Sequence, residues 1–249
     1  MTEPAETLQP LLYDADIASA AALIADSTRA AILRALLPDR PLAAGELARL
    51  AGVSAATASF HLAKLLDGGM ITVVRQGRHR YYRLAGHEVA AALEALGLIS
   101  PGLPVRSLRQ SREAAALDEA RTCYDHLAGK AGVELLDGML RRGLLEEKSG
   151  RTDRRDTSSL RFEVTGAGTK ELGSFGLNLL QLRRSRRHFA GTCIDWTQRR
   201  RHLNGALAAA ITSRLFELGW IERGQRRRSV LVTTAGIEGL ACAFGVDLA

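Results

Sequence analysis

The stretch from Leu42 to Arg83 constrains the fold of this chain more than any other, because two short amphipathic helices stand directly before two strands. Residues 44–50 have the first helical pattern, with Leu47 and Leu50 on the apolar side. Residues 54–66 have the second helical pattern, whose apolar stripe comprises Ala58, Leu62, Leu65 and Leu66. One face of the second helix is therefore expected to pack against a core, while the opposite face stays polar.

Short connections join these elements. Gly52 can adopt a positive φ between the two helices, and Ser54 can cap the second helix. Residues 70–74 and 79–84 are rich in β-branched and aromatic side chains and predict two strands joined by a turn. Two helices with a tight turn between them and a hairpin behind them make a winged helix-turn-helix.

The polar face of the second helix and the hairpin carry side chains that suit a DNA interface. Small hydroxyl groups near a helix start can meet base edges in a major groove about 12 Å wide, and a basic hairpin beside that helix can contact phosphates. The predicted DNA-binding residues are Ser54, Thr57, Ser59, His61 and Lys64 on the helix and Arg75, Arg78, Arg80 and Arg83 on the hairpin. The alternative is a winged domain that binds a protein partner and has a solvated hairpin.

Several motifs follow one another in this region. They are Glu46-Leu47-Ala48, Gly52-Val53-Ser54, Thr57-Ala58-Ser59-Phe60-His61-Leu62, Leu65-Leu66 and Gly69-Met70-Ile71. With them, residues 12–98 resemble the ArsR-type bacterial transcriptional regulators. The resemblance implies a dimeric winged-helix repressor that leaves its operator when an effector, often a metal ion, binds. The metal ligands of that family are missing here, since residues 46–51 contain no thiol and residues 88–98 contain no His or Asp.

The composition favours some partners and excludes others. A net charge of +7, from 34 Lys and Arg residues against 27 Asp and Glu, favours a polyanionic partner. No apolar run reaches the roughly 18 residues that a membrane span needs. Three cysteines in 249 residues are typical of reduced thiols in the cytoplasm. We therefore expect a cytoplasmic protein with no membrane partner.

The chain is expected to contain two domains. The predicted segments are a disordered tail (residues 1–10), a DNA-binding and dimerisation domain (11–99), a linker with a connecting helix (100–120) and a C-terminal domain (121–249). In the regulators that the chain resembles, helices on both sides of the winged motif join two protomers. This implies a homodimer on a palindromic operator in double-stranded DNA, with reading helices ~34 Å apart. For residues 87–98 the alternative is packing within the same chain.

An internal repeat organises the C-terminal domain, with copies at residues 121–180 and 190–249. Thr122-Cys123-Tyr124-Asp125 matches Thr192-Cys193-Ile194-Asp195, and further blocks recur in the same order. Each copy predicts a helix, a strand, a basic loop, and a strand leading into a helix capped by a threonine, Thr165 or Thr233. The expected fold class is therefore mainly α with small β-hairpins (α+β): a winged helix-turn-helix followed by two winged-helix-like half-units.

The matched blocks place ionisable side chains at corresponding positions of both copies. The candidate effector or metal site comprises Cys123, Asp125, His126, Cys193, Asp195 and His202. If the copies face each other, these groups can form a metal site or a thiol-disulfide pair. The alternative is structural: the cysteines pack as small apolar residues, and the aspartates cap helices that begin at His126 and Ala206. No cofactor follows from the sequence, which leaves a metal ion or a small-molecule effector open, and Cys242 is expected in the core.

Arginines gather in three clusters of the C-terminal half, at residues 183–187, 199–201 and 223–228. Three roles remain open for them: solvated surface, contact with phosphates that flank an operator, or an anionic effector site.

Two functions from different classes are compatible with these patterns. The first is a sequence-specific DNA-binding regulator whose C-terminal domain senses an effector or supports the dimer. The second is a thiol-dependent enzyme in which Cys193, Asp195 and His202 act as nucleophile, orienting acid and base. The chain lacks a glycine-rich phosphate loop, a Gly-x-Ser-x-Gly elbow and a His-Glu-x-x-His motif. The patterns therefore favour the regulator.

Overall fold

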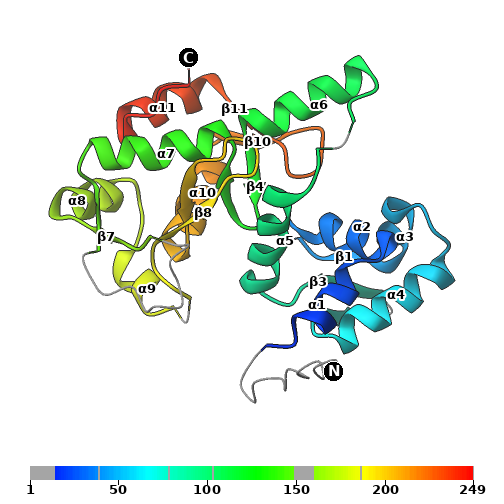
Figure 1. The fold of residues 1–249 in the computed structure, drawn as a ribbon. Helices are drawn as coiled ribbons and strands as arrows, with labels where there is room; N and C mark the ends of the chain where they lie inside the picture. Colours follow the sequence, from blue (N-terminus) through cyan, green and yellow to red (C-terminus); the bar gives the residue numbers. More distant parts are fainter. Residues whose placement is uncertain are drawn as a thin grey trace, which may run out of the picture. The chain divides into compact units, whose positions relative to one another are not determined.

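The computed structural model describes residues 15–38, 40–77, 79–102, 104–148, 160–185 and 187–248. The chain divides into two compact units (Figure 1): one runs to Arg34 and resumes over Pro41–Ala85, and the other comprises Ala35–Arg40 and Gly86–Ala249. Helices dominate and the strands form small antiparallel sheets, which confirms the expected fold class. The predicted tail at residues 1–10 and the predicted DNA contact Arg78 lie outside the described residues.

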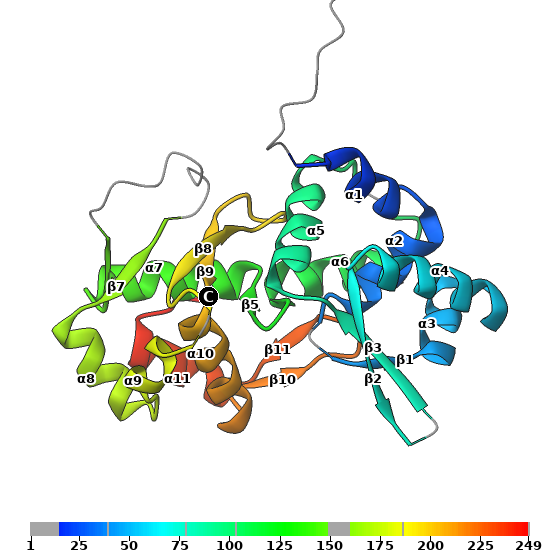
Figure 2. The same ribbon diagram turned by 90° about the horizontal axis from the view of Figure 1, so that it is seen from below.

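The winged helix-turn-helix is present as predicted. Its elements are α1 (Ile17–Ile24), α2 (Ser27–Leu36), β1 (Leu42–Ala43), α3 (Ala44–Ala51), α4 (Ala55–Asp67), β2 (Ile71–Gln76) and β3 (His79–Leu84). Strands β2 and β3 pair over their whole length and form the extended wing hairpin that Figure 2 shows. The sequence pattern missed β1, which adds a third strand by pairing with β3. Two residues are too few to produce an alternating pattern.

Local backbone chemistry sets the boundaries of the helices. Gly52 ends α3 with a φ of 68°, the left-handed region that favours glycine. Oγ of Ser54 accepts a hydrogen bond from the Thr57 amide and caps α4, and Asp26 does the same for Arg29 at the start of α2. The expected inward position of Leu50 is wrong, because this side chain is 45% exposed. The buried stripe of α3 instead follows the spacing of Leu47, Ala48 and the half-buried Ala51.

In the second unit, the order of elements at residues 121–174 recurs at residues 191–244. The elements are α5 (His87–Ile99), α6 (Leu108–Glu119), β4 (Arg121–Cys123), β5 (His126–Ala128), α7 (Lys130–Arg141), β6 (Leu145–Glu147), β7 (Phe162–Val164), α8 (Gly166–Ser174), α9 (Leu179–Arg183), β8 (Gly191–Ile194), β9 (Arg201–Asn204), α10 (Ala206–Glu217), β10 (Ile221–Arg223), β11 (Val230–Val232) and α11 (Thr234–Phe244). As expected, Thr165 caps α8 and Thr233 caps α11. The β4–β5 and β8–β9 hairpins were not predicted.

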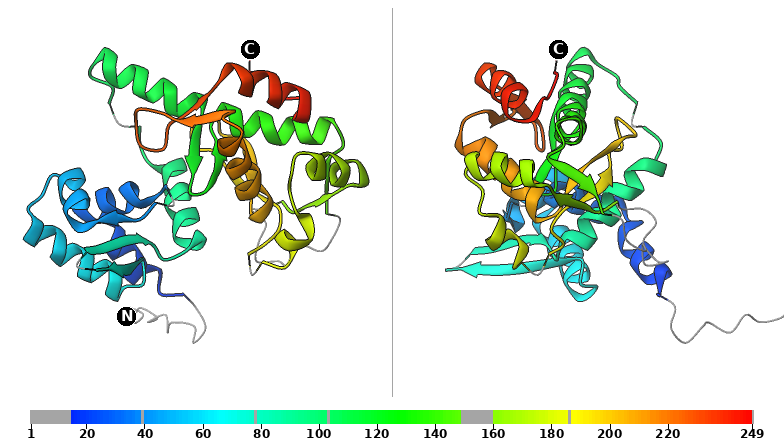
Figure 3. Two further views of the ribbon diagram at one scale, coloured as in Figure 1. Left: turned by 180° about the vertical axis from the view of Figure 1, so that it is seen from behind. Right: turned by 90° about the vertical axis from the view of Figure 1, so that its left-hand side faces the viewer.

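The two copies exchange contacts reciprocally. Arg121 in β4 forms a bridge with Ser229 of the second copy, and Gly191 in β8 forms one with Arg161 of the first. Helix α7 packs against β9, and α10 packs against β5. Helix α11 lies alongside α7 (Figures 1 and 3). Each copy therefore completes its core with elements of the other, and one apolar cluster spans both.

Two further expectations differ from the structure. The predicted domain boundary near residue 100 lies after α5, whereas α5 is part of the second unit, which begins again at Gly86. Glu94 in α5 is buried there and pairs with Arg228.

Cys242 is exposed rather than in the core, because it lies on the outer side of α11. None of the described helices combines the length and apolar character needed to cross a membrane.

Candidate functional site

The outer face of α4 carries most of the side chains predicted to read DNA. Ser54, Thr57, Ser59 and Lys64 are all exposed, while Ala58, Leu62 and Leu65 pack inward. The hydroxyl groups of Ser54 and Thr57 lie 2.9 Å apart. Ser54, which caps the helix, therefore also positions the hydroxyl group of Thr57. His61 differs from the other four. Its Nδ1 lies 3.5 Å from Oδ1 of Asp26, and its side chain is largely covered, so it faces α2 rather than solvent.

An aromatic residue on this face was missed as a candidate site residue. Phe60 is 58% exposed, and Nζ of Lys64 lies 4.6 Å from the centre of its ring. An exposed apolar ring on a reading helix can contact the methyl group of thymine. The signal was available in the sequence, since Phe60 lies outside the apolar stripe of the helix.

The wing presents its positive charge to solvent. Arg75, Arg80 and Arg83 are exposed. Arg75 and Arg80 are direct cross-strand partners, so two like charges stand opposite each other on the hairpin. Such a pair is unfavourable by itself. A bound polyanion would remove this repulsion, which makes the hairpin suited to a phosphate backbone.

Helix α1 has a composition that its surroundings do not explain. Its sequence is Ile-Ala-Ser-Ala-Ala-Ala-Leu-Ile, yet none of its residues is buried, and Ile17 is 73% exposed. In this helix Leu23 and Ile24 are half-buried and the other residues are exposed, and such an exposed apolar surface is typical of an interface.

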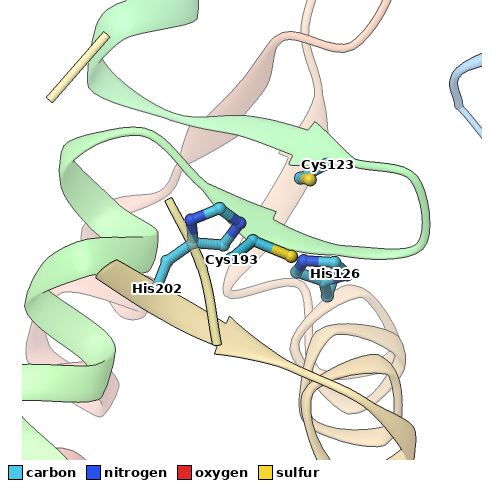
Figure 4. Close-up of side chains that lie close together, drawn as sticks. All are labelled: Cys123, His126, Cys193 and His202. Atoms are coloured by element: carbon cyan, nitrogen blue, oxygen red, sulfur yellow. The ribbon is translucent and has the colours of Figure 1, made fainter. Parts of the chain in front are cut away.

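In the second unit, two hairpins bring four of the six predicted effector-site residues together (Figure 4). Cys123 is the cross-strand partner of His126 in β4–β5, and Cys193 is the partner of His202 in β8–β9. Because β5 packs against β9, the two pairs meet. One ligand atom from each of the four side chains lies within 4.8 Å of the other three.

The imidazoles of this cluster are buried without the partners that buried nitrogens need. His126 is 0% exposed and His202 is 1% exposed. Nε2 of His126 and both ring nitrogens of His202 lack a hydrogen-bond partner among the described residues. A buried polar atom left in this state costs about 1–3 kcal/mol. The two buried histidines therefore destabilise the folded state, whereas apolar side chains packed in their place would not.

Neighbouring polar groups orient the cluster from outside. Nδ1 of His126 lies 3.1 Å from Oδ1 of Asp125, whose carboxylate also pairs with Arg187. Nδ2 of Asn204 donates to Sγ of Cys193 at 2.9 Å, and Nε2 of His188 donates to Oδ1 of Asn204 at 2.7 Å. Asp125 therefore orients the imidazole ring of His126 and is not itself part of the four-residue cluster. Asn204 and Arg187 were missed, although Asn204 follows His202 by two residues and so shares its face of the strand.

Asp195 has a structural position rather than a place in the cluster. Its carboxylate pairs with the buried Arg121 at 2.9 Å and accepts hydrogen bonds from the amides of Gly129, Thr197 and Gln198. The predicted helix caps are wrong. No helix begins at His126, because this residue lies in strand β5. Asp195 accepts a hydrogen bond from Gly129, the residue before α7 in the other copy. Nδ1 of His202 is 3.9 Å from Asp195, too far for the hydrogen bond that a catalytic triad requires.

The charges within the cluster are strongly perturbed. A hydrogen bond with Cys123 lowers the pKa of Cys193, and the same bond together with burial raises the pKa of Cys123. Burial lowers the pKa of His202 to about 3. Burial also opposes charge on His126, but its hydrogen bond with Asp125 and the nearby charge of Cys193 outweigh this and raise its pKa. These shifts favour the thiolate form of Cys193 and the neutral form of His202.

The arginine clusters mostly pair within the second unit. Arg200 binds Glu134 and Asp137, Arg226 binds Glu113, and Arg228 binds Glu94. A cavity of about 230 Å³ lies beside them; it is lined by Thr122 and by the arginines Arg40, Arg223, Arg226, Arg227 and Arg228, among others. Internal pairing accounts for much of this charge without a ligand.

Comparison with known proteins adds independent information on the chain. A model of the helix-turn-helix domain family matches residues 24–74. The uncharacterized HTH-type transcriptional regulator YdfF of Bacillus subtilis is 42% identical over 221 residues, which cover 89% of this chain and 93% of that protein. The similarity thus extends through both units.

Solved structures similar to the chain cover about a third of it. The homodimeric winged helix-turn-helix DNA-binding domain of a Mycobacterium bovis protein has 27% identity and a TM-score of 0.32, covering 36% of this chain and 89% of that one. NolR from Sinorhizobium fredii has 29% identity and a TM-score of 0.32, covering 35% and 86%. Reduced HlyU from Vibrio cholerae has 28% identity and a TM-score of 0.31, covering 34% and 90%.

Proposed function

Because this chain belongs to the family of HTH-type transcriptional regulators, which bind DNA, we propose that it represses transcription as a homodimer bound to a palindromic operator. In this proposal α4 enters the major groove, and the β2–β3 wing contacts phosphates beside it. The enzyme alternative has no support from the family, and the position of Asp195 argues against its catalytic triad.

One observation carries the proposed mode of binding. The first unit has a helix with exposed hydroxyl, ammonium and aromatic groups, and its wing has exposed arginines that face one another across two strands. Hydroxyl groups and a ring can distinguish bases, whereas guanidinium groups bind phosphate regardless of sequence. The two surfaces therefore have separable roles.

The exposed apolar helix α1 supports the dimer. A second copy would cover Ile17 and its neighbours, which one copy leaves in water. Two symmetric reading helices would then match an operator whose half-sites are one DNA turn apart. Sedimentation of the full chain, alone and with a palindromic duplex, measures whether two chains bind each duplex.

Replacing Thr57 and Ser59 with alanine is expected to lower affinity for the operator at least about tenfold, since a good base contact contributes about 1–3 kcal/mol of discrimination. Affinity for random DNA should change little. Both residues are exposed, and the cap of α4 survives because Ser54 bonds the backbone amide of residue 57. The measurement is fluorescence anisotropy with an operator selected from random duplexes and with a scrambled duplex.

The matched control for this pair is Thr169→Ala, which removes an exposed threonine from α8 in the other unit. It should leave both affinities unchanged. An equal loss on operator and scrambled DNA in the Thr57→Ala, Ser59→Ala variant would contradict a base-reading role for this face of α4.

Replacing Arg75 and Arg80 with alanine should weaken binding to every duplex. Each lost phosphate contact is expected to reduce the salt dependence, the slope of log K against log salt, by about one. Anisotropy titrations at several salt concentrations measure this slope. Arg109→Ala with Arg112→Ala makes the same change in net charge on α6 and serves as the control. An unchanged slope in the wing variant would remove the wing from the phosphate interface.

A further inference from the structure

We propose that Cys123, His126, Cys193 and His202 bind one zinc ion in a tetrahedral site that joins the two copies of the repeat. The site lies within the second unit, and each copy contributes one cysteine and one histidine. Because all four positions of the ion are filled by protein, the site is closed and has no place for a substrate.

The geometry needs little adjustment to hold the ion. With Zn–S of about 2.3 Å and Zn–N of about 2.0–2.1 Å, tetrahedral ligand atoms lie roughly 3.3–3.8 Å from one another. The four atoms here already lie within 4.8 Å of one another. Cross-strand pairing determines this arrangement, because directly opposed residues on a hairpin present their side chains on the same face. Small side-chain rotations are therefore sufficient.

The donor set selects the metal by its chemistry. Two sulfurs and two imidazole nitrogens in a tetrahedron suit zinc, whereas magnesium and calcium require oxygen ligands. Two thiolates also neutralise the double positive charge of the ion, so the filled site is neutral overall. A neutral site is the form that a buried position tolerates best.

The unpartnered nitrogens are the independent sign of a ligand. His126 is 0% exposed and His202 is 1% exposed, yet their rings contain nitrogens without a hydrogen-bond partner in the described part of the chain. Asp125 holds Nδ1 of His126, which leaves Nε2 free for a metal. A carboxylate that orients a histidine in this way is a recurrent feature of zinc sites. Asn204, which donates to Sγ of Cys193, orients a thiolate similarly.

Neither a disulfide nor simple packing accounts for these nitrogens. A disulfide between Cys123 and Cys193 would use both sulfurs but would leave both imidazoles buried and unpartnered. Simple packing would require apolar residues, which avoid the cost of buried polar atoms. A zinc ion satisfies all four side chains at once.

The test begins with metal analysis of the purified full-length chain by mass spectrometry. We expect one zinc per chain in the unaltered protein. Cys123→Ser, Cys193→Ser, His126→Gln and His202→Gln should each lose it. Two variants serve as controls: Cys242→Ser removes an exposed thiol, and His87→Gln removes a histidine whose ring centre lies 6.4 Å from that of His126. Both should keep the zinc.

A cobalt titration of the metal-free, unaltered chain avoids variants that fail to fold. Four-coordinate cobalt bound by thiolates has intense visible absorption and a sulfur-to-cobalt charge-transfer band, and zinc should abolish both by displacement. Asn204→Ala keeps all four ligands, and the loss of an orienting partner should weaken metal affinity about 10–100-fold.

Three results would overturn the proposal. One is a chain that contains no zinc and develops no tetrahedral cobalt spectrum. Another is full zinc content in the ligand variants. The third is a disulfide between Cys123 and Cys193 in protein purified and assayed without oxidant. None of these measurements involves DNA, so they are independent of the proposed operator binding.

Discussion

Replacing Asp195 with alanine is expected to destabilise the second unit by about 3–5 kcal/mol, because it leaves the guanidinium of Arg121 buried without its counter-charge. Both side chains are 0% exposed, and the two groups are 2.9 Å apart. The carboxylate also accepts hydrogen bonds from Gly129 and Thr197, so several donors lose their partner together. Urea unfolding followed by tryptophan fluorescence measures this loss, since Trp196 and Trp220 both lie in the second unit.

The controls for Asp195→Ala separate burial of charge from loss of bulk. Glu146→Ala removes an exposed carboxylate from β6 and should change stability by less than about 0.5 kcal/mol. Replacing both partners, Arg121→Met with Asp195→Leu, should cost less than the sum of the two single changes, because no buried charge then remains unpaired. Additive losses would show that the ion pair contributes nothing beyond packing.

The ion pair of Arg121 and Asp195 also predicts how the stability of the protein depends on pH. Burial acts to raise the pKa of Asp195, but Arg121 and the hydrogen bonds from Gln198 and Gly129 lower it below its usual value. An aspartate with a lowered pKa stabilises the folded state fully above its unfolded pKa of about 3.9, and this contribution is lost as the pH falls through the lower folded value. As the pH falls below about 4, the difference in stability between Asp195→Ala and the unaltered chain should therefore shrink progressively.

Replacing Gly168 with alanine is expected to cost about 3 kcal/mol, at the upper end of the usual cost of overpacking. A Cβ at this position would lie 2.0 Å from the carbonyl oxygen of Leu144, and backbone cannot give way as a flexible side chain can. Thr165 fixes the approach, because its hydroxyl accepts from the Gly168 amide and donates to the carbonyl of Gly143. Tryptophan fluorescence in urea is again the measurement.

Gly173→Ala provides the matched control within the same helix, α8. Nothing lies within 4 Å of a Cβ built at Gly173, so this change should leave stability unchanged or raise it by up to about 1 kcal/mol. The second copy repeats the experiment: a Cβ at Gly236 would lie 1.9 Å from the carbonyl oxygen of Trp220. Alanine at Gly168 and at Gly236 should lower the free energy of unfolding by similar amounts. If Gly168→Ala left stability unchanged, α8 would be able to shift away from the backbone of Leu144.

Sequence patterns predicted those features that depend on near neighbours. The polar and apolar faces of α4, its cap at Ser54 and the positive φ of Gly52 follow from spacing and from the chemistry of single residues. The threonine caps of the repeats were predicted on the same basis. Errors appeared where a neighbour distant in the chain decides which side is covered, as at Leu50 and Cys242.

Sequence patterns alone could not predict how the candidate metal cluster is assembled. The sequence alone determined that cysteine, aspartate and histidine recur in both copies, and it determined the helix-turn-helix, because helices of eight or more residues display their period. Only the tertiary structure decided that the cysteines stand opposite histidines and that the aspartates bind arginines instead. The strands concerned have three or four residues, too few to show a period, and the pairs meet through packing between copies about 70 residues apart.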